Sequence, residues 1–89
     1  MSKPQKKPIP EGLAKAFGQR VRELRTANTG LSQEDFADEI GVHRTVISRV
    51  ERGETNITFA NIFLICAGLK VTLSEFFAEF ESNIPESDA

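Results

Sequence analysis

The sequence predicts an all-α domain of five short helices. Apolar residues recur three and four positions apart, which is the spacing of one helical face. Four segments also begin with the same order of apolar and capping residues, which marks the start of a helix. No segment alternates apolar and polar residues long enough to indicate a strand. At 89 residues, the chain can form one domain with one modest core.

The first predicted helix covers residues 10–27. Pro10 suits its first turn, because that position needs no backbone N–H donor. One face then collects large apolar residues at spacings of four, four and three positions, namely Leu13, Phe17, Val21 and Leu24. Gly18 costs this helix about 1 kcal/mol relative to alanine. A close crossing by another helix would explain why a glycine stands there.

The four later helices are predicted from their N-caps. In each, an apolar residue precedes the cap and another follows it by four positions, which is the spacing of the hydrophobic staple. The caps are Ser32, His43, Thr58 and Thr72. They predict helices over 33–40, 44–52, 59–69 and 73–80. His43 is the weakest of the four, because histidine is less favoured as a cap than serine or aspartate.

Only three residues, Gly41, Val42 and His43, join the second and third predicted helices. A joint this short forces the two helices to cross steeply, and Ala37 is small enough to lie at their contact. Gly41 supplies a turn conformation that a Cβ atom would strain. The core contacts of the pair are assigned to Phe36, Ile40, Val42, Ile47 and Val50. This arrangement is a helix-turn-helix.

The outward face of the third helix predicts contacts with double-stranded DNA. Ile47 and Val50 are expected to face the core. Four polar residues then face outward together, namely Arg44, Thr45, Ser48 and Arg49. Arginine can donate two hydrogen bonds to guanine, serine and threonine can bond to base edges, and an exposed Val46 fits a thymine methyl group. Gln33, at the first turn of the second helix, is placed to hold a phosphate.

Two other residues near this helix each have more than one possible role. Arg25 is predicted either to form an ion pair with Glu51 or to contact a DNA phosphate. His43 is interpreted as a helix cap or as a neighbour of a phosphate. A metal site at His43 is not expected, because no second ligand lies at a suitable spacing.

The stretch LSQEDFADEIGVHRTVISRVERGE resembles the helix-turn-helix of the phage repressor and Cro family, also described as xenobiotic-response-element-like. A longer stretch, LRTANTGLSQEDFADEIGVHRTVISRVERGETNIT, is similar to controller proteins of bacterial restriction–modification systems. The resemblance covers about residues 13–80. It implies a compact five-helix, repressor-like domain. It also implies a sequence-specific transcriptional regulator that acts as a homodimer on a near-palindromic operator.

The resemblance implies roles for individual residues as well. The positions that match base contacts are Arg44, Thr45, Ser48 and Arg49. The positions that match DNA backbone contacts are Gln33, Arg25 and Arg52. In related domains the fifth helix forms the dimer interface, which corresponds here to Leu73, Phe76, Phe77 and Phe80. Leu73 and Phe76 are expected to fill the inward stripe of that helix, whereas Phe77 and Phe80 extend beyond it.

The chain departs from the family pattern at two places. Arg25 and Gly30 lie five positions apart where four is usual, so one residue is inserted. The insertion leaves open where the first helix ends and where Arg25 points. Lys70 stands where a glycine usually follows the fourth helix. Either Lys70 adopts a positive φ or that helix ends in another way.

The charge of the chain is distributed unevenly. Residues 1–30 carry seven Lys or Arg and two Glu, whereas residues 54–89 carry one Lys and six acids. The net charge of −2 alone argues mildly against nucleic acid, but binding depends on the charge of one face. A limited basic face is expected from Arg20, Arg22, Arg25 and Arg52. The predicted parts are a flexible basic arm over 1–9, the domain over 10–81, and an acidic tail over 82–89.

Several classes of function are not indicated. The chain has no hydrophobic signal region or membrane-length apolar run, and its single cysteine, Cys66, cannot form an internal disulfide, so a cytoplasmic location is expected. Catalytic residues, a metal, a cofactor and a small-molecule ligand are not expected. The alternative to a DNA-binding regulator is an antitoxin-type interaction module that also represses its own operon. A scaffold domain that has lost DNA binding is a third possibility.

Overall fold

The computed structural model describes residues 11–54, 57–78 and 80, and within them it has the all-α fold that the sequence predicts. The helices are α1 (Glu11–Leu24), α2 (Gln33–Ile40), α3 (Arg44–Glu51), α4 (Phe59–Leu69) and α5 (Leu73–Phe77), with a π-helical segment, η1 (Arg25–Thr29), after α1. The predicted arm, 1–9, and tail, 82–89, lie outside the described residues, as do residues 10 and 81 that bound the predicted domain.

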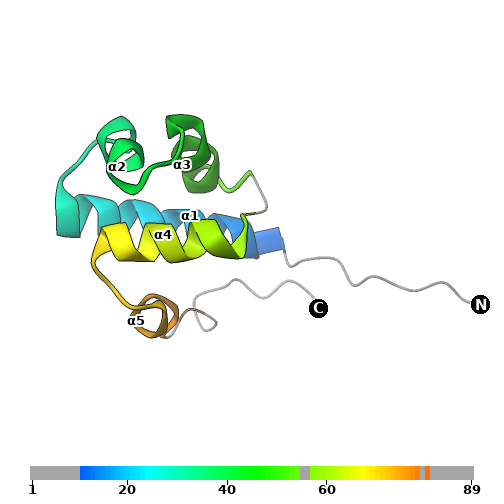
Figure 1. Ribbon diagram of the computed structural model, residues 1–89. Helices are drawn as coiled ribbons and strands as arrows, with labels where there is room; N and C mark the ends of the chain where they lie inside the picture. Colours follow the sequence, from blue (N-terminus) through cyan, green and yellow to red (C-terminus); the bar gives the residue numbers. More distant parts are fainter. Residues whose placement is uncertain (1–10, 55–56, 79, 81–89) are drawn as a thin grey trace, which may run out of the picture.

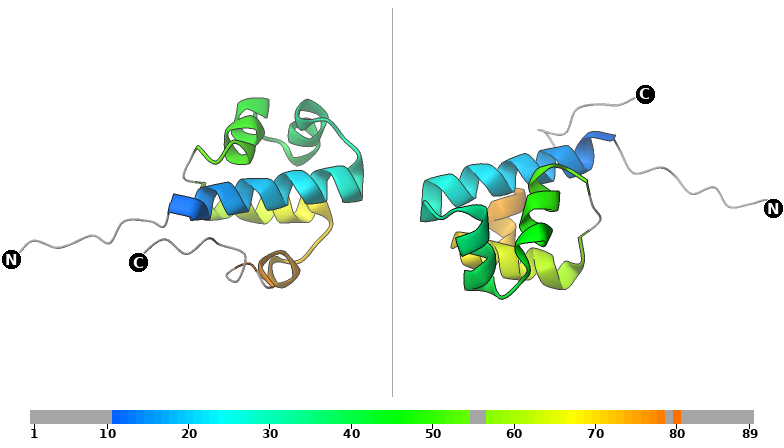
Figure 2. Two further views of the ribbon diagram at one scale, coloured as in Figure 1. Left: turned by 180° about the vertical axis from the view of Figure 1, so that it is seen from behind. Right: turned by 90° about the horizontal axis from the view of Figure 1, so that it is seen from above.

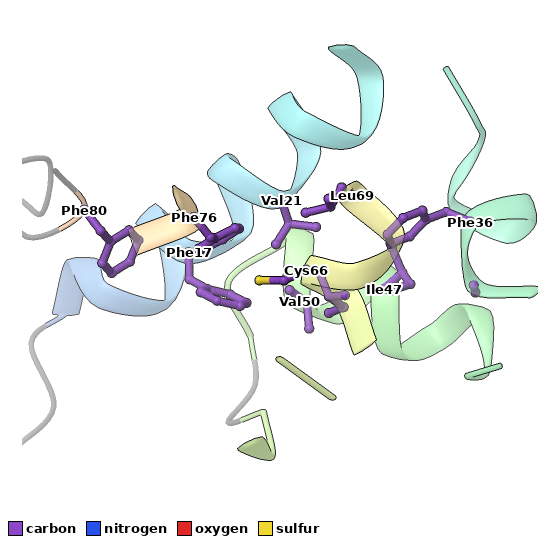
Figure 3. Close-up of a cluster of buried hydrophobic side chains, with 11 residues drawn as sticks. Phe17, Val21, Phe36, Ile47, Val50, Cys66, Leu69, Phe76 and Phe80 are labelled. Carbon is purple, nitrogen blue, oxygen red and sulfur yellow. The ribbon is translucent and has the colours of Figure 1, made fainter. Parts of the chain in front are cut away.

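Two of the five α-helices form a central pair, and the other three pack against its two opposite sides. Helices α1 and α4 lie side by side, α2 and α3 cover one side of this pair, and α5 lies on the opposite side (Figures 1 and 2). The apolar side chains of all these helices meet in one core (Figure 3). Its fully buried members include Val21, Phe36, Ile47, Ile65, Leu69 and Phe76. The outward face of α3 is therefore presented on the side that lies away from α5.

The four predicted N-caps are confirmed. The side chains of Ser32, His43, Thr58 and Thr72 each accept a hydrogen bond from a backbone N–H in the first turn of the following helix. At α5 the capping box is complete, because the Glu75 carboxylate also accepts from the backbone N–H of Thr72 at 2.8 Å. Local capping thus explains where α2 to α5 begin.

Helix ends were predicted less well than helix starts. The fifth helix ends at Phe77 rather than at residue 80, because Ala78 takes an extended conformation. The third ends at Glu51, one residue earlier than predicted. At the end of α4, Lys70 adopts the left-handed conformation with φ 66°. Of the two endings that the sequence left open, the structure has the one in which a lysine occupies a glycine position.

The inserted residue near the end of the first helix is accommodated as a π turn. The predicted end at residue 27 is wrong: the α-helix stops at Leu24, and η1 continues the coil to Thr29. Gly30 then closes this wide turn, with φ 69° and a backbone hydrogen bond to the Arg25 carbonyl at 3.0 Å. The π-helix is rare in proteins and is found mostly as single turns of this kind that continue an α-helix. The side-chain amide of Asn28 donates to the Leu69 carbonyl at 2.8 Å, which ties η1 to α4.

Gly18 lies where α1 and α3 cross closely, as its place inside a predicted helix suggested. A Cβ atom on Gly18 would come within 2.1 Å of the Val50 carbonyl oxygen and 3.0 Å of the Glu51 Cα atom. Both neighbours are backbone atoms, so neither can turn away as a side chain would. The missing side chain therefore sets how closely α3 packs on α1.

Candidate nucleic-acid interface

Helix α3 has the orientation that the sequence predicts. Ile47 is fully buried and Val50 is almost so. Arg44, Thr45 and Arg49 are exposed on its outward face, whereas Ser48 is half-buried beside them. The three exposed residues carry hydrogen-bond donors, and Thr45 carries an acceptor as well. A short helix with such an outward face can enter the major groove of DNA and reach base edges.

Val46 contributes less to this outward face than predicted. It is half-buried and packs against the hydrophobic core. With Thr45 and Arg49 it also lines a small hollow that continues to Ile57 and Asn61 near the start of α4. Part of the Val46 side chain remains accessible, so its contact with a thymine methyl group stays a prediction.

Arg52 lies at the end of α3 and is held by two partners. It donates to the Ser48 hydroxyl at 2.9 Å and to the two carboxylate oxygens of Glu54 at 2.7 and 3.1 Å. These hydrogen bonds raise the pKa of Arg52 and lower that of Glu54. Both side chains are about half exposed, so water screens the pair. The sequence did not point to Glu54, because no helical spacing rule links it to Arg52.

His43 connects the turn to the outward face of α3. Its Nδ1 atom accepts from the backbone N–H of Thr45 at 3.1 Å and lies 2.9 Å from the Thr45 hydroxyl oxygen. The capping role is therefore confirmed. Because Nδ1 serves as an acceptor, the ring proton of the neutral imidazole lies on Nε2, where it can be donated to a phosphate. That phosphate contact stays a prediction.

Arg25, Glu51 and Gln33 form a polar network behind α3. Arg25 donates to both carboxylate oxygens of Glu51 at 2.7 and 2.9 Å and to the Leu31 carbonyl at 2.7 Å. Gln33 donates to Glu51 at 2.9 Å. The side chains of Arg25 and Glu51 are only 12% and 3% exposed, and the hydrogen bonds that Arg25 donates to the Glu51 carboxylate raise the pKa of Arg25.

This network shows one of the two roles that the sequence left open for Arg25. Of the two roles proposed for Arg25, the ion pair with Glu51 is confirmed, and the phosphate contact stays a prediction. The bond from Gln33 to Glu51 was not predicted, since the two residues lie on different helices with no shared pattern. Glu51 thereby joins the last turn of α3 to the start of α2 and to the start of η1.

The expected basic face is smaller than predicted. Arg20 lies on the α5 side, where it donates to the carbonyls of Phe76 at 2.7 Å and Glu75 at 3.2 Å, and its guanidinium lies 5.4 Å from the centre of the Phe76 ring. Arg25 is nearly buried. Arg22 and Arg52 do lie together, with Lys15, along a shallow groove between α1 and the end of α3. Lys15 was not assigned to this face from the sequence.

The residues predicted for the dimer interface mostly belong to the core of one chain. Phe76 is fully buried, and Leu73 is half-buried against the core. Phe80 was predicted to extend beyond the core, but it is only 7% exposed and packs edge-on against Phe17 and Phe77. The prediction for Phe80 is wrong because the chain turns back after α5 instead of continuing as a helix. Phe77, at 38% exposure, is the member of the set that keeps a large exposed part.

Within the described ranges, no three His, Cys, Asp or Glu side chains cluster closely enough to bind a metal ion. No helix of those ranges has both the length and the apolar content needed to cross a bilayer.

Known proteins resemble this chain over most of its length. The helix-turn-helix family matches residues 21–76. Control protein C.MunI of Mycoplasma sp is 45% identical over 67 residues, which are 75% of this chain and 90% of that protein. Control protein C.BamHI of Bacillus amyloliquefaciens is 46% identical over 55 residues, which are 62% of this chain and 68% of that protein.

Solved structures agree with these relatives. The restriction-modification controller protein C.AhdI from Aeromonas hydrophila superposes with a TM-score of 0.67 at 44% identity, over 72% of this chain and 96% of that one. The controller protein C.Esp1396I, solved as a tetramer in complex with its natural 35 base-pair operator, gives a TM-score of 0.72 at 32% identity, over 81% and 93% of the two chains. The chain therefore belongs to the helix-turn-helix family and, within it, to the control proteins of restriction–modification systems.

Proposed function

We propose that the chain is a sequence-specific DNA-binding transcriptional regulator that acts as a homodimer on a near-palindromic operator. The observation that carries this proposal is the outward face of α3, where Arg44, Thr45 and Arg49 are exposed together above a buried apolar face. Such a face offers hydrogen bonds to base edges in the major groove. The solved operator complex of the relative C.Esp1396I supports the same kind of ligand.

Within this proposal, the residues around α3 divide into two groups. The base contacts are assigned to Arg44, Thr45, Val46, Ser48 and Arg49. The backbone contacts are assigned to Gln33, His43, Arg25 and Arg52. Arg25 and Gln33 are the least free of these, because both already bond to Glu51. Their contribution is to fix α3 rather than to supply most of the phosphate contacts.

The domain alone reads too few base pairs to find one genomic site, so two copies must act together. A two-fold dimer demands two half-sites about 10 base pairs apart, or a small departure from that spacing. The proposal includes a cytoplasmic location and no catalytic activity. The matching relatives are control proteins, which favours regulation over the antitoxin alternative.

The test begins with an operator, obtained by selecting bound duplexes from a random pool. Arg44→Ala should then weaken binding to the selected duplex by about 1–3 kcal/mol and weaken binding to unrelated duplex much less. Arg22→Ala is the matched control, because it removes an exposed arginine of α1 that lies off the outward face of α3. The control should weaken both duplexes to a similar, small degree. Equal losses on the two duplexes for Arg44→Ala would show that Arg44 contacts phosphate and does not read bases.

A further inference from the structure

The hydroxyl group of Thr45 is tied to the imidazole ring of His43. The Nδ1 atom of His43 accepts a hydrogen bond from the backbone N–H of Thr45 at 3.1 Å, which caps α3. The same nitrogen lies 2.9 Å from the Thr45 hydroxyl oxygen. Both residues are exposed, and Thr45 lies on the outward face of α3, to which the proposed function assigns the base contacts. The contact with His43 therefore affects how Thr45 can bond to a base.

The cap determines which of the two side chains donates the second hydrogen bond. Nδ1 can accept from the Thr45 backbone N–H only when it carries no proton. An unprotonated Nδ1 presents a lone pair, and the hydroxyl oxygen presents lone pairs as well, so a separation of 2.9 Å requires a hydrogen atom between them. Only the hydroxyl group can supply that hydrogen. The Thr45 O–H therefore donates to His43, and the Thr45 oxygen keeps two lone pairs that can accept.

A threonine that can only accept distinguishes the bases in the major groove. Adenine and cytosine each present an amino group there, which is a hydrogen-bond donor. Guanine and thymine present a carbonyl oxygen at the corresponding place, which is an acceptor. A hydroxyl group that rotates freely can bond to either kind of base. With its hydrogen held by His43, the Thr45 hydroxyl can bond only to an amino group.

We propose that His43 is a positioning residue that makes Thr45 read adenine or cytosine through the amino group of the base. The inference rests on the proposed function and deepens it, because it assigns a base preference to one of the contacts of α3. His43 acts here through Thr45 and does not itself touch the base. Its Nε2–H remains available for the phosphate contact described above.

Ser48 provides a contrast on the same helix, because its hydroxyl group is held in the opposite sense. The Arg52 guanidinium donates to the Ser48 hydroxyl oxygen at 2.9 Å. This bond occupies one lone pair of Ser48 and leaves its hydrogen able to donate. The bond therefore does not prevent Ser48 from meeting the carbonyl oxygen of guanine or thymine. Removal of the Ser48 hydroxyl group is thus a matched control for removal of the Thr45 hydroxyl group.

The experiment measures base preference at one position of the selected operator. Duplexes are selected at about pH 8, which favours neutral imidazole, and the position is the one whose preference Thr45→Val removes. Wild type should prefer adenine or cytosine there. Exchange of that base for guanine or thymine, respectively, should weaken binding roughly tenfold, because two acceptors then face each other. Thr45→Val should reduce this penalty to about threefold or less, and Ser48→Ala should keep it.

Two substitutions of His43 separate its effect on Thr45 from its role as a cap. Glycine is well tolerated as an N-cap but has no side-chain acceptor, so His43→Gly frees the Thr45 hydroxyl group to donate. Asparagine caps with a side-chain oxygen that can accept from Thr45. His43→Gly should therefore reduce the penalty to about threefold or less, and His43→Asn should keep it. Loss of a phosphate contact would weaken all duplexes alike and leave the penalty unchanged.

The nitrogen-15 signals of the imidazole ring provide a check that does not depend on DNA. His43 is the single histidine of the chain, so its ring signals are identified without ambiguity. They should show that Nδ1 carries no proton in the free chain. Circular dichroism shows whether each variant is folded. If His43→Gly does not fold, the nitrogen-15 signals and Thr45→Val still test the proposal.

The outcomes for the proposal and for the proposed function are distinct. A proton on Nδ1 would overturn the proposal, and so would guanine or thymine at the Thr45 position or the full penalty in folded His43→Gly. The absence of any position whose preference depends on Thr45 would overturn it as well. In each of these cases selective DNA binding would stand. A chain that selects no duplex would instead refute the proposed function, and the base preference with it.

Discussion

Helices α3 and α4 follow each other in the chain, and each buries one face in the same core, but their outward faces differ. The outward face of α3 carries Arg44, Thr45 and Arg49, whereas that of α4 carries Phe59, Phe63 and Leu64. The first can satisfy the hydrogen-bonding groups of a polar ligand, and the second can only be removed from water. Neighbouring helices of one small domain thus suit two ligands of opposite chemistry.

The contacts that hold α3 and α4 in the fold also differ in their chemistry. Hydrogen bonds depend on angle and distance, whereas apolar contacts do not depend on direction. Helix α3 is fixed by the bonds of Glu51 to Arg25 and Gln33 and by the close approach of Gly18. The buried side of α4 is apolar, with Ile65, Cys66 and Leu69. Side-chain hydrogen bonds thus add to the apolar contacts of α3 at Glu51, whereas α4 accepts a hydrogen bond from Asn28 at the Leu69 carbonyl near its end.

Removal of Glu51 should have the largest effect on stability. Glu51→Ala leaves the nearly buried Arg25 without its carboxylate, which should lower the free energy of unfolding by about 3 kcal/mol. The matched control is Glu54→Ala, which removes the ion pair with Arg52; its contact is also 2.7 Å long but joins exposed side chains. Urea denaturation should show a large shift of the midpoint for Glu51→Ala and little change for Glu54→Ala. Equal shifts of the urea midpoint for the two variants would mean that the buried ion pair contributes no more to stability than the exposed one.

Salt should act on the two outward faces in opposite ways. If each copy makes two ionic phosphate contacts, operator affinity should fall about a hundredfold between 50 and 200 mM salt. Any association of copies through the uncharged outward face of α4 should stay constant or strengthen over the same range. Fluorescence anisotropy with labelled operator measures the first, and sedimentation measures the second. Operator binding that does not change with salt would contradict the electrostatic contribution of α3 and its surroundings.

A side chain at Gly18 should push α3 away from α1. Gly18→Ala places a Cβ atom against the Val50 carbonyl and should cost about 2 kcal/mol of stability, although alanine favours helix. Gln19→Ala, at the exposed neighbouring position, controls for helix propensity. Thermal unfolding should place Gly18→Ala below wild type and Gln19→Ala near it. Stabilisation by Gly18→Ala would show that the crossing can relax without loss of packing.

The smallest effect is expected at the end of α4. Lys70 holds a left-handed conformation that costs a residue with a side chain about 1 kcal/mol. Lys70→Gly removes that cost but makes the unfolded chain more flexible, so stability should rise by about 0.5 kcal/mol. The melting temperature should therefore increase by a few degrees at most. A decrease would mean that the lysine side chain contributes contacts that offset its backbone cost.

The sequence predicted the helix starts and the facing of α3 because both depend on neighbours in the chain. A cap needs a partner two or three residues away, and the facing of α3 needs only its own apolar spacing. The end of α5 was missed because Phe80 packs on Phe17, a contact between distant parts of the chain. The interface residues were taken from a resemblance, and the resemblance did not show which phenyl rings this core uses.

Part of the polar site on α3 could be predicted because it depends only on the spacing of residues within one helix. Arg44, Thr45 and Arg49 could be placed outward from helical spacing alone. Spacing gave no sign that Gln33 would turn to Glu51, that Arg20 would cap α5, or that the exposed apolar face would lie on α4. These features depend on which helices become neighbours, and local patterns in the sequence do not determine that.

The π turn at Arg25–Thr29 has a consequence for how chains of this kind can change length during evolution. One extra residue in a regular helix rotates everything beyond it by about 100°. Here the surplus is taken up within one wide turn that closes at Gly30, so the Ser32 cap still starts α2 in register with its core. Deletion of the exposed Ala27 should return the segment to an ordinary helical turn without displacing α3. This junction is therefore a place where a residue can be gained or lost while the DNA-reading helix keeps its position.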